Sequence, residues 1–231
     1  MYNELLWLGF ALLDLAMVLL VFRYFGKVGM FGLVAFNLIV CNIQVLKTVE
    51  MFGLTFTLGN VLYASVFLST DILSEFYGKV VARRAVFLGF VVLLLTLVYM
   101  QLALRFVPAP SDWVQPYLES IFGFLPRVVL GSLVAYLVSQ LHDVWAFHFW
   151  KRRTQGGKLW LRNNASTLVS QLLDSVIFCT IAFLGVFPWP VFWEILLTTY
   201  GIKLVMGLLD TPFIYLARRI RPLEVPDGDA A

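Results

Sequence analysis

Seven apolar stretches, each about long enough to cross a lipid bilayer, follow one another along this chain of 231 residues. They run roughly over 5–22, 28–46, 54–77, 85–105, 122–144, 164–187 and 191–217. A spanning helix needs about 20 apolar residues. Only 13% of the residues are charged, whereas soluble domains carry about 25%. The sequence therefore predicts an all-α, polytopic helical membrane bundle of six or seven transmembrane helices, with one integral membrane domain over 1–221 and a disordered cytoplasmic tail over 222–231.

Most of the 17 basic residues cluster in loops at one end of the predicted bundle, and only Lys47, Arg105 and Arg127 fall near the other end. The clustered residues are Arg23, Lys27, Lys79, Arg83, Arg84, Lys151, Arg152, Arg153, Lys158, Arg162, Arg218, Arg219 and Arg221. Loops rich in lysine and arginine stay on the cytoplasmic side of a membrane. This distribution predicts an N-terminus outside and a C-terminus inside. The net charge of +3 is not a nucleic-acid footprint, because it resides in these loops.

Polar residues recur at helical spacing within several apolar stretches. The stretch 54–77 carries Asn60, Phe67, Asp71 and Glu75 on one face. The stretch 164–187 carries Asn164, Thr167, Gln171 and Asp174 on one face, with Asn163 beside it, and the last stretch contains Lys203. Charged residues inside a membrane normally face the protein interior or a water-filled path. These stripes predict a polar site within the bundle.

The depth of each charged residue follows from a rise of about 1.5 Å per helical residue. Counted from the nearest basic residue of the inner end, Asp71 lies roughly 12 Å deep, Asp174 roughly 18 Å and Lys203 roughly 22 Å. The hydrocarbon core is about 30 Å thick, so these groups bracket its midplane, where transporters bind their substrates. Pairing of Lys203 with an acid to hold the bundle together is the alternative. For Glu75, near the inner surface, and Asp14, in the first stretch, solvation and structural pairing respectively are the simpler interpretations.

Motifs for catalysis and for nucleotide binding are absent from the sequence. There is no His-Glu-x-x-His, no Gly-x-Ser-x-Gly and no Gly-x-x-x-x-Gly-Lys-Ser/Thr. Cys41 and Cys179 lie inside apolar stretches and are interpreted as buried hydrophobic residues. We therefore expect no enzyme, no cofactor, no metal site and no nucleic-acid partner.

Two sequence blocks resemble those of a known transporter family. The first is Ser69-Thr70-Asp71-Ile72-Leu73-Ser74-Glu75-Phe76-Tyr77-Gly78-Lys79, followed by Ala82-Arg83. The second runs from Trp160-Leu161-Arg162-Asn163-Asn164 through Ser166-Thr167 and Ser170-Gln171 to Asp174-Ser175, with Ser139–Trp145 before it. Both are similar to the queuosine precursor transporters, within the wider group of bacterial vitamin-uptake proteins. The likeness covers roughly 37–220. Members usually have six spans, so the first stretch and its Asp14 inherit nothing from it.

The resemblance implies import of 7-deazaguanine bases, such as preQ0, preQ1 or queuine, across the bacterial cytoplasmic (inner) membrane. These bases are salvaged for a tRNA modification. Asp71 or Asp174 can accept the adjacent N–H groups of a guanine-like edge. Amide or ammonium donors for its carbonyl are offered by Asn163, Asn164, Gln171 and Lys203. Phe67 is the best placed residue for stacking on the ring.

Two further interpretations of the same residues remain open. The chain could be a substrate-binding membrane subunit that transports only with an ATP-driven energising complex, or an assembly protein whose polar stripes only hold helices together. Proton coupling is also open, with Asp71 or Glu75 as titrating groups. A chain of this size is expected in the bilayer as a possible homodimer.

Overall fold

The computed structural model describes residues 2–153, 159–209, 211–220 and 222–223, and most of them are helical. The elements are α1 (Tyr2–Gln44), β1 (Thr48–Met51), β2 (Leu54–Thr57), α2 (Asn60–Tyr77), α3 (Lys79–Ala103), α4 (Gln115–Phe122), α5 (Leu125–Arg153), α6 (Leu159–Phe183), α7 (Trp189–Leu209) and α8 (Thr211–Ile220). The predicted helical class is confirmed. The predicted tail lies almost wholly outside the described residues.

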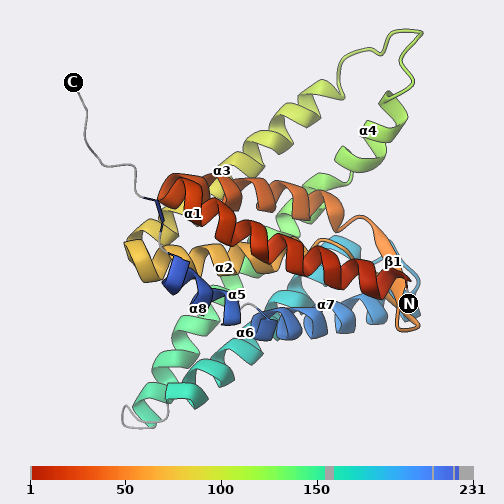
Figure 1. The fold of residues 1–231 in the computed structure, drawn as a ribbon. Coiled ribbons are helices and arrows are strands. Elements are labelled where there is room, and N and C mark those ends of the chain that lie inside the picture. Colours follow the sequence, from red (N-terminus) through yellow and green to blue (C-terminus); the bar gives the residue numbers. More distant parts are fainter. Residues whose placement is uncertain (1, 154–158, 210, 221, 224–231) are drawn as a thin grey trace, which may run out of the picture.

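Helix α1 combines the first two predicted spans. At Gly26 the backbone leaves the helical conformation, with φ 51° and ψ −136°, values that glycine adopts without a Cβ clash. The chain reverses there, so the two halves of α1 run in opposite directions (Figure 1). The two predicted stretches, 5–22 and 28–46, therefore correspond to the two halves.

A β-hairpin corrects the predicted boundary of the third span, because 54–57 is strand rather than helix. Strands β1 and β2 pair antiparallel, with Met51 opposite Leu54. The two residues between them, Phe52 and Gly53, both have positive φ, 53° and 73°. Such a turn matches the twist of paired strands. Asn3 donates a hydrogen bond to the carbonyl of Glu50 at 2.9 Å, which ties the hairpin to the start of α1.

The last predicted span, 191–217, is also corrected, because it is divided between α7 and α8. Pro212 is the second residue of α8. A proline in the first turn of a helix leaves no hydrogen bond unmade, but in a helix interior it removes one and clashes with the preceding turn. A continuous helix through Pro212 is therefore unfavourable. The loop predicted before the fifth span likewise contains a helix, α4.

The bundle packs around two main apolar clusters. One lies between α1 and α2 and extends to Met206 of α7 and Ala217 of α8. The other joins α5, α6 and α7 around Val128, Phe178 and Ile195. Helices α1, α2 and α7 run alongside one another, whereas α5 and α6 pair with each other and cross this group at an angle (Figure 1). The interior between the two groups is where polar residues gather.

Three helical segments in the described part of the chain are long and apolar enough to cross a membrane. They are Tyr2–Gln44, Val80–Ala103 and Gln115–Ser139, with a shorter apolar segment at Leu168–Phe183. This supports a helical membrane protein. The predicted number of spans and their orientation are not tested by it.

Gly59, which precedes α2, tests the close contact between α1 and α2. A Cβ at this buried position would lie 2.4 Å from the carbonyl oxygen of Cys41 and 2.9 Å from Cβ of Val45. Backbone must shift to admit it, and overpacking of this kind costs about 1–3 kcal/mol. We expect Gly59→Ala to lower the melting temperature of the purified protein in detergent. Gly201→Ala is the control, because nothing lies within 4 Å of its added Cβ. Equal melting temperatures for the two variants would contradict this packing.

Candidate functional site

A pocket opens in the interior between the α1–α2 group and the α5–α6 pair. Its empty space, which includes a part open to solvent, is about 480 Å³. Five helices and the turn before α2 contribute its walls, together with Phe90 of α3. The lining residues are Leu38, Cys41, Asn42, Val45, Gly59, Asn60, Tyr63, Phe90, Ser132, Ala135, Asp174, Phe178 and Lys203.

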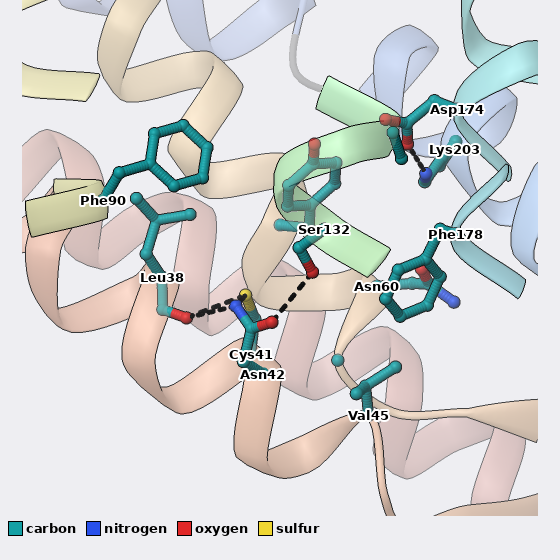
Figure 2. Close-up of a pocket in the computed structure, with 13 residues that line it drawn as sticks. Leu38, Cys41, Asn42, Val45, Asn60, Phe90, Ser132, Asp174, Phe178 and Lys203 are labelled. Carbon is teal, nitrogen blue, oxygen red and sulfur yellow. Dashed lines mark hydrogen bonds and ion pairs between the residues drawn. The ribbon is translucent and has the colours of Figure 1, made fainter. Parts of the chain in front are cut away.

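One wall of the pocket carries an ion pair between Lys203 of α7 and Asp174 of α6 (Figure 2). The two side chains are only 7% and 8% exposed. Ser139 of α5 donates a hydrogen bond to Oδ1 of Asp174 at 3.4 Å. The ammonium of Lys203 also lies 5.1 Å from the centre of the Tyr63 ring, where the ring's negative face attracts it. Two charges are thus held out of water by each other and by two further helices.

The opposite wall is fixed by Asn42 of α1. Its Oδ1 accepts a hydrogen bond from Ser132 of α5 at 2.9 Å, and its Nδ2 donates to the carbonyl of Leu38 at 2.7 Å. Figure 2 shows both bonds beside Cys41. The amide therefore connects α1 to α5 directly below the pocket surface.

Asn60 forms the third polar part of the pocket, at the first residue of α2. Its Nδ2 donates to Oγ1 of Thr57 at 3.1 Å and to Oγ1 of Thr199 at 3.3 Å. The side chain thereby ties the end of the hairpin and α2 to α7. Because these bonds engage the amide nitrogen, the amide oxygen of Asn60 is the atom left to receive a ligand donor.

Aromatic side chains complete the lining. Tyr63, Phe90 and Phe178 come from α2, α3 and α6. Phe67, one turn beyond Tyr63, does not line the pocket but packs edge-on against Tyr63, with ring centroids 5.0 Å apart. Flat rings around a buried ion pair suit a planar, polar solute.

Three residues predicted from the sequence meet in this pocket: Asn60, Asp174 and Lys203. Gln171 lies about one turn before Asp174 on α6, and its Oε1 is buried without a hydrogen-bond partner among the described residues. The pairing of Lys203 with an acid, the alternative noted from the sequence, is present in the structure.

The other predicted residues lie elsewhere. Asp71 is on an exposed face of α2, outside the pocket lining. Glu75 forms an ion pair of 2.9 Å with Arg218 of α8, and both side chains are about half exposed. The side chains of three further predicted residues fall outside the described part of the structure: Asn163, Asn164 and Thr167.

Sequence reasoning missed Asn42 and Ser132. Asn42 lies off the helical face that carries Asn37 and Cys41. Ser132 shares a helical face with Tyr136 and Ser139, and that face was the signal that could have found it.

These features place the chain in the class of helical membrane proteins that have a polar pocket between their helices. A family model described as "Putative vitamin uptake transporter" matches residues 57–217, and the chain belongs to this family. The match confirms the resemblance found in the sequence. Because the family consists of transporters, it also confirms that the chain is not an enzyme. The first helix lies outside the matched residues.

Two curated relatives extend the comparison. The chain is 48% identical over 223 residues to the "Probable queuosine precursor transporter" of Bacillus subtilis (strain 168), covering 96% of this chain and 97% of the relative. It is 29% identical over 187 residues to the "Queuosine precursor transporter" of Escherichia coli (strain K12), covering 78% and 81%. No solved structure matches the chain. The Bacillus alignment is long enough to include most of α1.

The buried ion pair generates a stability prediction. Removing one member of such a pair leaves the other charge buried alone and costs about 3–5 kcal/mol. We expect Asp174→Asn and Lys203→Met each to lower the melting temperature in detergent, and the double variant to recover most of the loss. A double-mutant cycle of melting temperatures measures this coupling. Additive losses in the double variant would show that the two charges do not depend on each other.

Proposed function

We propose that this chain imports 7-deazaguanine bases, the queuosine precursors, across the bacterial cytoplasmic membrane. The names of the two relatives, and the chain's membership of a family of vitamin-uptake transporters, support this substrate class. In this proposal the chain crosses the membrane with its N-terminus outside and its C-terminus inside, because most of its basic residues lie in the loops that are predicted to face the cytoplasm.

The observation that carries the proposal is the buried Lys203–Asp174 pair in the pocket wall. A guanine-like base presents adjacent N–H donors next to a carbonyl oxygen. A carboxylate accepts hydrogen bonds from the two N–H groups, and an ammonium donates one to the carbonyl oxygen. The base can therefore insert between Asp174 and Lys203 and replace, for each side chain, the hydrogen bond that its partner made.

The remaining lining accounts for the rest of a planar base. Tyr63, Phe90 and Phe178 offer faces and edges for the ring, and the amide oxygen of Asn60 accepts an N–H. Phe67 supports the site from behind Tyr63. These contacts favour a flat heterocycle over a flexible chain of equal polarity.

The predicted residues outside the pocket belong, in this proposal, to the route between the pocket and the cytoplasm. Asp71 and Glu75 follow Asn60 and Phe67 at helical spacing along α2, toward its inner end. Gln171 precedes Asp174 on α6, and Asn163, Asn164 and Thr167 stay proposals from the sequence alone. An acid such as Asp71 suits precursors that carry an aminomethyl cation.

Uptake by whole cells tests the proposal. We expect cells that can neither make nor import queuosine precursors to take up labelled preQ0 or preQ1 when they express this chain alone. Asp174→Asn should reduce uptake about 10- to 100-fold, because a hydrogen bond to a charged group contributes about 1.5–3 kcal/mol. The measurement is the initial rate of uptake at matched membrane levels.

Two comparisons make the result specific. Glu119→Gln, in exposed α4, replaces one acid by its amide far from the pocket and should leave uptake unchanged. The double variant Asp174→Asn/Lys203→Met should remain inactive even where its stability is recovered. Binding by the wild type without uptake would favour the alternative subunit of an ATP-driven complex, and neither binding nor uptake of any precursor would refute the substrate class.

A further inference from the structure

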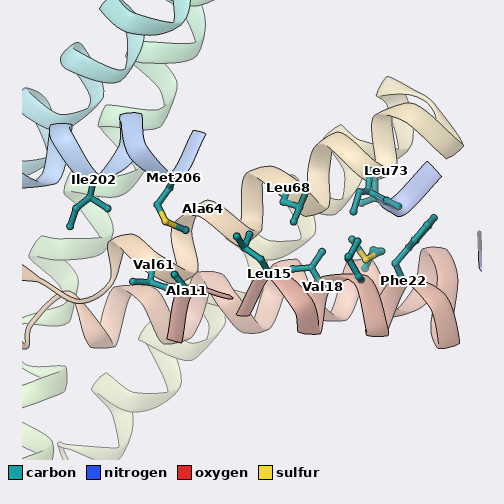
Figure 3. Packing of buried hydrophobic residues seen from close by; sticks show 14 of the residues in the cluster. Ala11, Leu15, Val18, Phe22, Val61, Ala64, Leu68, Leu73, Ile202 and Met206 are labelled. Carbon is teal, nitrogen blue, oxygen red and sulfur yellow. The ribbon is translucent and has the colours of Figure 1, made fainter. Parts of the chain in front are cut away.

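A second polar cluster is buried between the two halves of α1 and α2, away from the pocket lining. Asp14 comes from the first half of α1, Asn37 from the second half, and Ser65 and Ser69 from α2. Their exposed fractions are 8%, 1%, 0% and 0%. Apolar residues surround the cluster: Figure 3 shows Ala11, Leu15 and Val18 of α1 packed against Val61, Ala64 and Leu68 of α2. Asp14 is therefore a carboxyl group in a dry contact between helices.

The hydrogen bonds of this cluster leave it short of a donor. Asn37 donates from Nδ2 to Oγ of Ser65 at 2.6 Å, and Ser65 donates to the carbonyl of Leu62 at 2.8 Å. The Ser65 side chain also lies within hydrogen-bonding reach of the Asp14 carboxyl. Three buried oxygens have no partner among the described residues: Oδ2 of Asp14, Oδ1 of Asn37 and Oγ of Ser69. Two of them can only accept unless Asp14 carries a proton.

No cation in the described part of the chain neutralises Asp14. The other charged or titratable side chains described on α1 and on the elements packed against it are Tyr2, Glu4, Arg23, Tyr24, Lys27, Cys41, Glu50, Tyr63, Asp71, Glu75, Tyr77, Arg83, Arg84, Tyr99, Arg127, Tyr136, His142, Tyr215, Arg218 and Arg219. Among these residues no charged side chain pairs with the Asp14 carboxyl, and Ser65 is the polar side chain within its hydrogen-bonding reach. Lys203, the buried ammonium, is engaged by Asp174 instead.

A buried carboxylate without a counter-charge is strongly unfavourable, so it takes up a proton instead. A proton on Oδ2 of Asp14 makes that oxygen a hydrogen-bond donor. Among the described residues, the cluster also contains an acceptor without a donor, Oδ1 of Asn37. We propose that Asp14 is a proton-binding site whose protonation couples substrate transport to the proton gradient. The coupling rests on the proposed transport function, whereas the proton site itself does not.

The helices that hold this cluster also carry the pocket. Asn37 precedes Cys41 and Asn42 on the second half of α1, and Ser65 follows Asn60 and Tyr63 on α2. A protonated Asp14 is compatible with the close α1–α2 contact. A deprotonated one demands water or a cation and so disfavours that contact. Proton binding therefore favours one arrangement of two pocket walls, which is the requirement for coupling two sites.

Transport by the purified full chain in liposomes tests the coupling. With labelled preQ0, wild-type protein should exchange substrate at equal pH on both sides. An inward proton gradient of one pH unit should drive up to about tenfold accumulation for one coupled proton. Asp14→Asn, which mimics the protonated group, should keep exchange but lose accumulation. Asp112→Asn, an exposed acid in the loop before α4, is the control and should accumulate like the wild type.

Infrared spectroscopy of the same preparations tests the proton site independently of transport. The carbonyl stretch of a protonated carboxyl group should persist in wild-type protein just above about pH 5, where a solvated aspartate is already ionised, and it should be missing in Asp14→Asn. Identical carbonyl bands in the wild type and in Asp14→Asn would overturn the proton-binding site. Gradient-driven accumulation by Asp14→Asn, or accumulation driven by sodium at equal pH, overturns the proton coupling. Absence of exchange in the wild type refutes the proposed transport function instead, and the infrared result still decides the site.

Discussion

The interior of this protein depends on one requirement: a charge taken out of water must be neutralised where it lies. Lys203 and Asp174 meet it by pairing across α6 and α7, with side chains less than a tenth exposed. Because neither charge is tolerable alone, the pair fixes the relative position of two helices and, through Ser139, of a third. The same pair is the most polar part of the pocket. This single contact thus holds the bundle together and, in the proposed function, also binds the substrate.

The other pocket walls are held by separate polar contacts. Asn42 connects α1 to α5 through Ser132, and Asn60 connects α2 to α7 through Thr199. In each contact, the side-chain amide of the asparagine forms a hydrogen bond with a hydroxyl group on a neighbouring helix. These contacts hold the walls at their spacing, and the ion pair and three aromatic rings belong to the same lining. Such preorganisation limits the ordering that substrate binding would require.

The sequence predicted the helices well, because length and apolarity determine a membrane span almost alone. It also singled out Asn60, Asp174 and Lys203, since a polar residue in an apolar stretch needs a partner. Helix counting gives depth along the membrane normal but not the side of the bundle that a residue faces. Asp71 was therefore grouped with the pocket although it lies on an exposed face of α2. The hairpin was missed because its turn depends on the conformation of Phe52 and Gly53 rather than on hydropathy.

Helix α2 has two polar faces that lie against charged groups of different kinds: one group has a counter-charge in the described part of the bundle and the other does not. On the pocket side, Tyr63 lies against an ammonium whose carboxylate partner is built into α6. On the side toward α1, Ser65 lies against Asp14, for which the described residues provide no cation. The first face has its counter-charge built into the bundle, and in the proposed function this is where the base binds. A missing counter-charge makes the second face depend on a proton from outside the protein. A rigid helix that joins the two faces can make occupancy of one a condition for the arrangement of the other.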